Sequence, residues 1–295
     1  MSPSNLRPRA ERALIKALRK RRDIEPDRDD RLELLRPLVV ETIDEANLKR
    51  ALEDIGLGDG QELRWTKRDD GSPRPPSINS IFSSCGAALN NFGPWRLAPE
   101  SLSLLGESGF SELRFEAKLP IFHRGRAPNL DVLLYDEERV FAVESKLCEH
   151  LTPGKQAKFK ESYDRVGPSS HESWAALYEL LKVRPERFCY LDVGQLVRHY
   201  FGLAKQTSEG GAHARKRALL IYLYWEPDDA DDQDACLRHR DEVEAFKQIV
   251  ADPGVPFVAL THRQLWESWK TQRDQPEWLP KHVSLLEARY AVAVG

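Results

Sequence analysis

The spacing of hydrophobic residues changes along the chain, and each spacing predicts a different kind of element. Apolar residues recur every three or four positions in the first third of the chain, which predicts helices over residues 7–22, 40–55 and 78–91. Apolar and charged residues then alternate over residues 112–122, which predicts a strand with one buried face. The chain therefore begins with helices and changes to strands near its middle.

Two further strands, over residues 130–135 and 140–147, are joined by the charged turn 136–139 and form a predicted hairpin. The rest of the chain predicts helices over 156–166, 173–182, 193–205, 241–251 and 263–270, and strands over 218–225 and 256–260. Helices, then a three-stranded meander, then mixed helices and strands are typical of an α/β fold. We expect a mixed β-sheet flanked by helices.

Residues 66–77 interrupt this pattern, because they are polar, rich in proline and without periodicity. They predict a linker. We therefore expect an N-terminal helical extension over residues 1–65 and one main domain over residues 78–295.

Composition excludes several classes of protein. The longest apolar run, residues 218–225, is far short of the roughly 20 residues that a membrane span needs. The first residues carry no apolar stretch of the kind found in secretory signals. The four cysteines are widely scattered, without a CxxC pair, as expected of reduced thiols. These observations predict a cytoplasmic protein that does not enter a membrane.

The net charge of −3 excludes a protein that coats nucleic acid through a large positive excess. Contacts with nucleic acid must come from local patches, and residues 7–22 supply one candidate. Only Glu11 balances its basic residues, which are Arg7, Arg9, Arg12, Lys16, Arg19, Lys20, Arg21 and Arg22. The simpler interpretation of this run, a solvated helix face, stays open.

The predicted hairpin brings two acids together. If residues 136–139 form the turn, Tyr135 pairs with Val140, and the numbers of paired residues sum to 275. Asp131 then lies opposite Glu144 on a face shared with Lys146. Like charges directly opposite one another destabilise a sheet, and the apolar neighbours predict burial, which increases the repulsion. A divalent cation held by both carboxylates would offset it.

Carboxylate oxygens favour Mg²⁺ or Mn²⁺ over zinc. Such an ion lowers the pKa of a bound water and polarises a phosphate, while a lysine can orient the water and stabilise the transition state. The carbonyl of Ser145, at the edge of the site, is a candidate further ligand. The alternative is a buried salt bridge of Lys146 with Asp131 and Glu144, without catalysis.

Asp131, followed by Glu144-Ser145-Lys146 on the adjacent strand, resembles the motif of the PD-(D/E)xK nuclease superfamily, which includes restriction endonucleases. Pro128 departs from the motif, since it does not directly precede the aspartate. The resemblance covers about residues 77–265 and implies a restriction-endonuclease-like core. It also implies that Asp131 and Glu144 bind metal and that Lys146 acts at the attacking water. Many relatives carry a further glutamate on the first core helix, but residues 78–91 contain no acid.

Other residues are weaker candidates. Arg124, Arg126, Lys155 and Lys158 flank the motif, where cations could hold nucleic-acid phosphates, although solubilising charge explains them equally well. A second acid-x-lysine triplet begins at Glu116. If residues 123–128 form the loop between its strand and the next, paired residues sum to 251 and Glu116 lies opposite Tyr135, too far from Asp131 to share a metal. We therefore expect Glu116 on a solvated strand face. His199 is expected to be an ordinary helix-face histidine.

The sequence thus predicts a metal-dependent nuclease that uses Mg²⁺ or Mn²⁺ and hydrolyses phosphodiester bonds. DNA is the expected substrate, with RNA left open. Many restriction-type enzymes act as dimers, so a homodimer is also left open. The alternative from another class is a catalytically silent nucleic-acid-binding or assembly subunit with the same fold.

Overall fold

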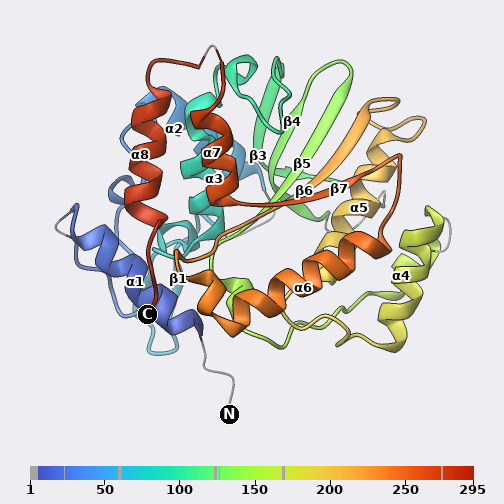
Figure 1. The fold of residues 1–295 in the computed structure, drawn as a ribbon, viewed down its shortest axis with the longest axis horizontal. Coiled ribbons are helices and arrows are strands. Elements are labelled where there is room, and N and C mark those ends of the chain that lie inside the picture. The colour runs from blue at the N-terminus through green and yellow to red at the C-terminus, as the bar shows by residue number, and fades with distance from the viewer. Residues whose placement is uncertain are drawn as a thin grey trace.

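The computed structural model describes residues 6–22, 24–58, 62–122, 125, 127–167, 170–273 and 275–295. In this part of the chain a five-stranded sheet lies between two layers of helices (Figure 1). The strands of the sheet, in spatial order, are β3 (Glu112–Lys118), β4 (Asn129–Tyr135), β5 (Arg139–Lys146), β6 (Arg217–Tyr224) and β7 (Phe257–Thr261). The helices are α1 (Leu6–Arg19), α2 (Glu45–Leu57), α3 (Ser84–Phe92), α4 (Glu172–Val183), α5 (Val193–Thr207), α6 (Asp234–Ile249), α7 (His262–Lys270) and α8 (Leu279–Tyr290).

The sheet is mixed, as predicted. Strands β3, β4 and β5 are antiparallel neighbours, whereas β6 and β7 run parallel to β5. Parallel neighbours need long crossovers, and here α4 and α5 connect β5 to β6 while α6 connects β6 to β7. The expected α/β fold with a mixed sheet between helices is therefore confirmed.

The two faces of the sheet have separate hydrophobic cores because side chains alternate along each strand. In β5, Phe141 and Val143 pack against the layer that contains α2, α3, α7 and α8, whereas Val140 and Ala142 pack against the layer of α4, α5 and α6. Glu144 is two positions beyond Ala142 and so shares the face that α5 covers.

The N-terminal helices join the first of these cores. Leu6 and Leu14 of α1 and Leu48 of α2 belong to the same buried cluster as Phe115 and Val132 of the sheet. Between these helices and α3, the segment expected to be a linker contains a short hairpin of β1 (Thr66–Lys67) and β2 (Pro73–Arg74). That expectation missed the hairpin because its strands have two residues each, too few for a period.

Three predicted helices differ clearly from the structure. The helix expected over 241–251 begins earlier, because α6 starts at Asp234. Residues 156–166 are extended up to a short 3₁₀ turn, Glu161–Arg165, because Lys155 and Ala157 donate backbone hydrogen bonds to the distant carbonyls of Cys189 and Pro185, both at 2.9 Å. The helix expected over 78–91 begins later, as α3. Ser83 caps it by accepting a hydrogen bond from the Gly86 amide. Helix α8 was not predicted.

No described helix is long and apolar enough to cross a membrane. The four cysteines are free thiols in this structure.

Candidate active site

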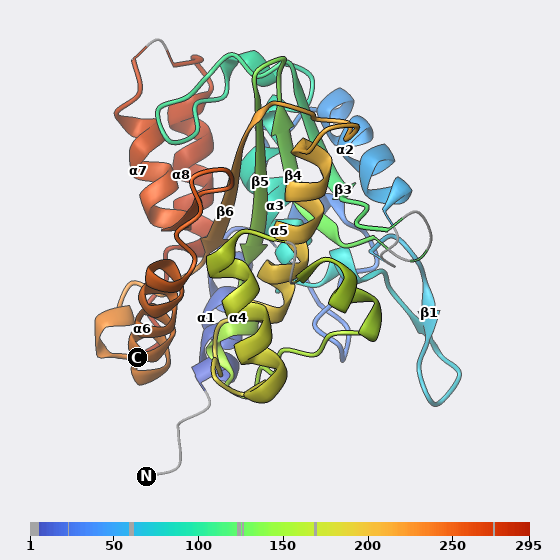
Figure 2. The same ribbon diagram turned by 90° about the vertical axis from the view of Figure 1, so that its right-hand side faces the viewer.

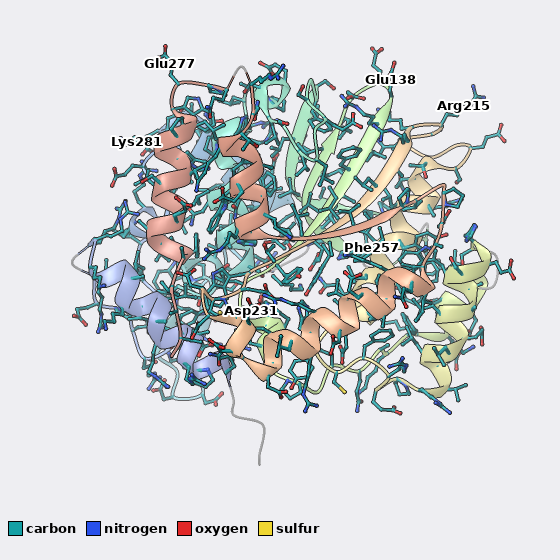
Figure 3. The ribbon with its side chains drawn as sticks, in the orientation of Figure 1. Glu138, Arg215, Asp231, Phe257, Glu277 and Lys281 are labelled. Carbon is teal, nitrogen blue, oxygen red and sulfur yellow. The ribbon has the colours of Figure 1, made fainter. Side chains whose placement is uncertain are left out.

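The hairpin of β4 and β5 has the predicted register, in which paired residues sum to 275. Its ladder runs from Tyr135–Val140 to Val132–Val143. Beyond that pair, the carboxylate of Asp131 accepts a hydrogen bond from the amide of Ser145 at 2.7 Å. A side chain therefore replaces the next backbone contact between the two strands. Glu138, in the turn, marks the opposite end of the hairpin (Figure 3).

Glu144 and Lys146 lie together at the end of β5. The ammonium of Lys146 donates a hydrogen bond to Oε1 of Glu144, and only 2% of the Glu144 side chain and 13% of the Lys146 side chain are exposed. Helix α5 brings His199 to the same carboxylate, with Nε2 2.8 Å from Oε2 of Glu144. His199 lies on a helix, as expected, but its contact with Glu144 was not foreseen. Its position in the sequence, 55 residues from Glu144, gave no signal.

Glu116 is a third acid at this site, contrary to the expectation of a solvated strand face. Paired residues of β3 and β4 sum to 247, with Phe115 beside Val132 and Ala117 beside Leu130, so Glu116 lies at the level of Asp131. It is only 8% exposed, and its backbone adopts the left-handed region with φ of 47°. Such a conformation costs energy for a residue with a side chain and is often found at functional sites.

Asp131 thus stands on the middle strand between an acid of β3 and an acid of β5. Burial, then Glu144 and Glu116, raise its pKa well above the ordinary value. Burial and Glu62 raise the pKa of Glu116 to about 7. For Glu144 burial acts in the same direction, but Lys146 and His199 outweigh it and lower its pKa to about 2. If all three acids were ionised, their charge would exceed that of Lys146, and the raised pKa values of Asp131 and Glu116 reflect this repulsion.

A polar cavity of about 400 Å³ is lined in part by residues of α1 and α3, and Glu116, Asp131 and Glu144 are not among its lining residues. Its wall includes Cys85, whose thiol hydrogen-bonds with Glu116, and Glu62, which raises the pKa of that acid. The cavity is also lined by three arginines, Arg7, Arg31 and Arg74. Five acids also line it, so the lining has no excess of positive charge; they are Glu11, Asp29, Asp30, Glu62 and Glu149.

The donor set fits a hard divalent cation, because it consists of carboxylate oxygens from Glu116, Asp131 and Glu144. Oε2 of Glu144 and Nε2 of His199 are buried without a well-aligned hydrogen bond among the described residues, so this oxygen can still accept a ligand bond. Within the described ranges, however, no three acidic, histidine or cysteine side chains are already gathered as a metal-binding group. Metal binding would therefore require these carboxylates to rotate.

The other residues predicted for the site are Ser145 and four cations. Ser145 is fully buried between Glu144 and Lys146. Arg124 and Arg126 lie outside the described residues. Lys155 is half-buried near His150, and Lys158 is exposed. Both belong to the extended segment before Glu161 rather than to a helix.

The chain belongs to a family described as Restriction Endonuclease associating with ARP, whose model matches residues 29–291. Neither the curated proteins nor the solved structures contain a significant match. The match includes the whole sheet and each of the acids above, and it agrees with the restriction-endonuclease-like architecture.

Proposed function

We propose that this member of the restriction-endonuclease family is a metal-dependent nuclease that hydrolyses phosphodiester bonds in DNA. The observation that carries the proposal is the meeting of Asp131, Glu144 and Lys146 at the point where the backbone pairing of β4 and β5 ends. RNA remains a second substrate to test, because nothing in these three residues distinguishes the two sugars.

Asp131 and Glu144, with the carbonyl of Ser145, would hold Mg²⁺ or Mn²⁺, and Glu116 is positioned to add a third carboxylate. When bound, the cation would neutralise phosphate charge and lower the pKa of a water molecule. Lys146 carries only hydrogen-bond donors, so it would orient the attacking water and stabilise the negative transition state. His199 would keep Glu144 charged and in place.

Cations outside this group would position the substrate. Lys155 and Lys158, together with Arg124 and Arg126, are proposed to hold backbone phosphates, which fixes the register of a nucleic acid without reading its sequence. We further propose a cytoplasmic location, in which the four free cysteines stay reduced.

The second candidate is a catalytically silent nucleic-acid-binding or assembly subunit. It is favoured by the contacts of Glu144, whose two oxygens face Lys146 and His199 as in a structural salt bridge. The family description adds an association with ARP, and we extend that association to this chain as part of either proposal. Pairing of two copies is a further proposal, and the oligomeric state of the purified protein in solution tests it.

The deciding experiment is cleavage of plasmid and single-stranded DNA with Mg²⁺ or Mn²⁺. We expect the wild type to cut and Lys146→Ala to lose at least about a hundredfold in rate, as when a transition-state donor is removed. A matched control is Lys182→Ala, which removes an exposed lysine of α4. Metal-dependent cutting that survives in Lys146→Ala would place the chemistry elsewhere.

Metal binding can be measured separately from cleavage. Mn²⁺ should raise the melting temperature of the wild type, because a ligand that binds only the folded state stabilises it. Asp131→Asn should lose most of that rise. A wild type that neither cuts DNA or RNA nor gains stability from either metal would support the silent subunit.

A further inference from the structure

The hairpin of β1 and β2, with its flanking residues, forms a ribbon over residues 64–75 that projects from the body of the protein (Figure 2). Thr66 pairs with Arg74 and Lys67 with Pro73. Side chains on a two-stranded ribbon alternate between two faces, so Thr66, Arg68 and Arg74 share one face. Trp65 and Lys67 share the other.

The first face is fastened to the body. Arg68 forms ion pairs with Asp27 and Asp29, and its side chain is only 13% exposed. Arg74 lies 3.1 Å from the same Asp29 carboxylate. These contacts hold the ribbon in one orientation, so its second face is presented to solvent on a fixed support.

The second face exposes an unusual side chain. Trp65 is 52% exposed, whereas Trp95, Trp174, Trp225, Trp266 and Trp269 are each at most 2% exposed. Lys67 beside it, and Arg64 just before it, are exposed and form no ion pair within the described part of the chain. A large aromatic ring next to uncompensated cations is the combination that binds nucleic-acid strands, because bases stack on the ring while phosphates meet the cations.

The base of the ribbon belongs to the candidate active site. Glu62 lies close enough to Glu116 to raise its pKa. Trp65 follows Glu62 by three residues, and one residue of chain spans at most about 3.6 Å, so the Cα atoms of Glu62 and Trp65 are within about 11 Å of each other. Arg74, on the second strand, lines the cavity whose wall also includes Glu62 and Cys85. That cavity has the volume of a site for one small molecule, about 400 Å³. It is too small for an intact duplex.

We infer that Trp65 and Lys67 form a stacking platform for an unpaired base of the strand that enters the active site. The inference rests on the proposed nuclease function and specifies its substrate as single-stranded or frayed DNA. A protein partner bound at Trp65 is the competing occupant, but it would not explain why the ribbon lies beside Glu62 and the acid Glu116.

The test is binding without cleavage, in EDTA, of fluorescent oligothymidylate and of a blunt duplex. We expect Trp65→Ala to weaken oligothymidylate binding about tenfold and Trp65→Phe to restore most of it, since a phenyl ring still stacks. Duplex binding should change little. Val183→Ala, which trims another exposed apolar residue, is the matched control. Oligothymidylate should also quench the fluorescence of the wild type more than that of Trp65→Phe.

Unchanged oligothymidylate binding by Trp65→Ala would overturn the platform, and so would an equal loss for single strand and duplex. If Trp65→Ala binds oligothymidylate as the wild type does but no longer co-purifies with a protein partner, the ribbon is the binding site of that partner. Because these measurements need no catalytic metal, they stand apart from the nuclease proposal. A protein that binds through Trp65 but never cuts would support the platform and refute the nuclease.

Discussion

Asp131 is held between Glu116 and Glu144, and this arrangement opposes folding. Burial and both neighbours raise its pKa, so the folded protein carries an electrostatic cost that an apolar site would avoid. Lys146 and His199 compensate mainly Glu144, for which they lower the pKa to about 2 despite burial. The raised pKa values of Glu116 and Asp131 favour their protonated forms, and a bound cation would stabilise their ionised forms instead.

Glu116→Gln tests this interpretation. Removing one of three neighbouring buried acids should stabilise the metal-free protein by about 1 kcal/mol. This is the upper end of the free energies found for side-chain pairs that lie opposite one another in a sheet. The same change should reduce the rise in melting temperature that Mn²⁺ causes. Thermal denaturation with and without Mn²⁺ measures both effects, and Glu112→Gln, at the far end of β3, is the control. A variant less stable than the wild type without metal would contradict the prediction.

The sequence was sufficient to predict the pair Asp131 and Glu144 because a short turn sets the register of their hairpin. It was not sufficient for Glu116. Strand β3 ends at Lys118 and not near residue 122, so the loop to β4 is longer than assumed and paired residues sum to 247 instead of 251. His199 comes from a helix distant in the sequence, and only the packing of α5 on β5 brings it to Glu144.

Among the elements, α5 is the one whose fit fixes the site, because it carries His199 against the end of β5. It approaches the chain after β3 very closely at Gly202. A Cβ atom on Gly202 would lie 2.6 Å from Cβ and 2.8 Å from the carbonyl oxygen of Leu119. Backbone cannot yield as a flexible side chain does, so α5 itself would have to move.

Gly202→Ala should therefore destabilise the protein by about 1–3 kcal/mol through overpacking, although alanine is the better helix former by about 1 kcal/mol. Gly86→Ala in α3 is the matched control, because its Cβ would meet mainly the Ser83 side chain, at 3.2 Å. Urea denaturation of the three proteins measures the difference. If both substitutions stabilise the protein, the packing of α5 against Leu119 is looser than the structure indicates.

Long, strongly periodic elements were predictable, whereas elements decided by distant contacts were not. Residues 156–166 favour a helix locally, but the amides of Lys155 and Ala157 donate hydrogen bonds to the carbonyls of Cys189 and Pro185, and these bonds keep the segment extended. Helix α8 did leave a signal, since Leu279, Val283, Leu286 and Tyr290 follow a helical repeat and are all buried. That repeat could have been found from the sequence.

At the scale of the whole molecule, the interior keeps several histidines neutral. Burial lowers the pKa of His150 and His282 to about 4 and that of His262 to about 3. In the unfolded chain a histidine has a pKa of about 6.5. Between about pH 6.5 and 4 the unfolded chain binds protons that the folded protein does not. The free energy of unfolding must therefore fall as the pH drops through this window.

His282 offers the cleanest measurement, because it lies on α8, away from the acids. Its ring nitrogens contact Thr42 at 2.7 Å and the carbonyl of Asn91 at 3.2 Å. Each neutral buried histidine contributes a slope of about 1.4 kcal/mol per pH unit within the window. His282→Gln should remove one such contribution, so its stability should depend less steeply on pH than that of the wild type. The exposed His171→Gln should keep the full slope. Urea denaturation from pH 7 to 4 measures the free energy of unfolding of the three proteins. If this free energy falls equally steeply with pH in the wild type and in His282→Gln, His282 accepts its proton without unfolding.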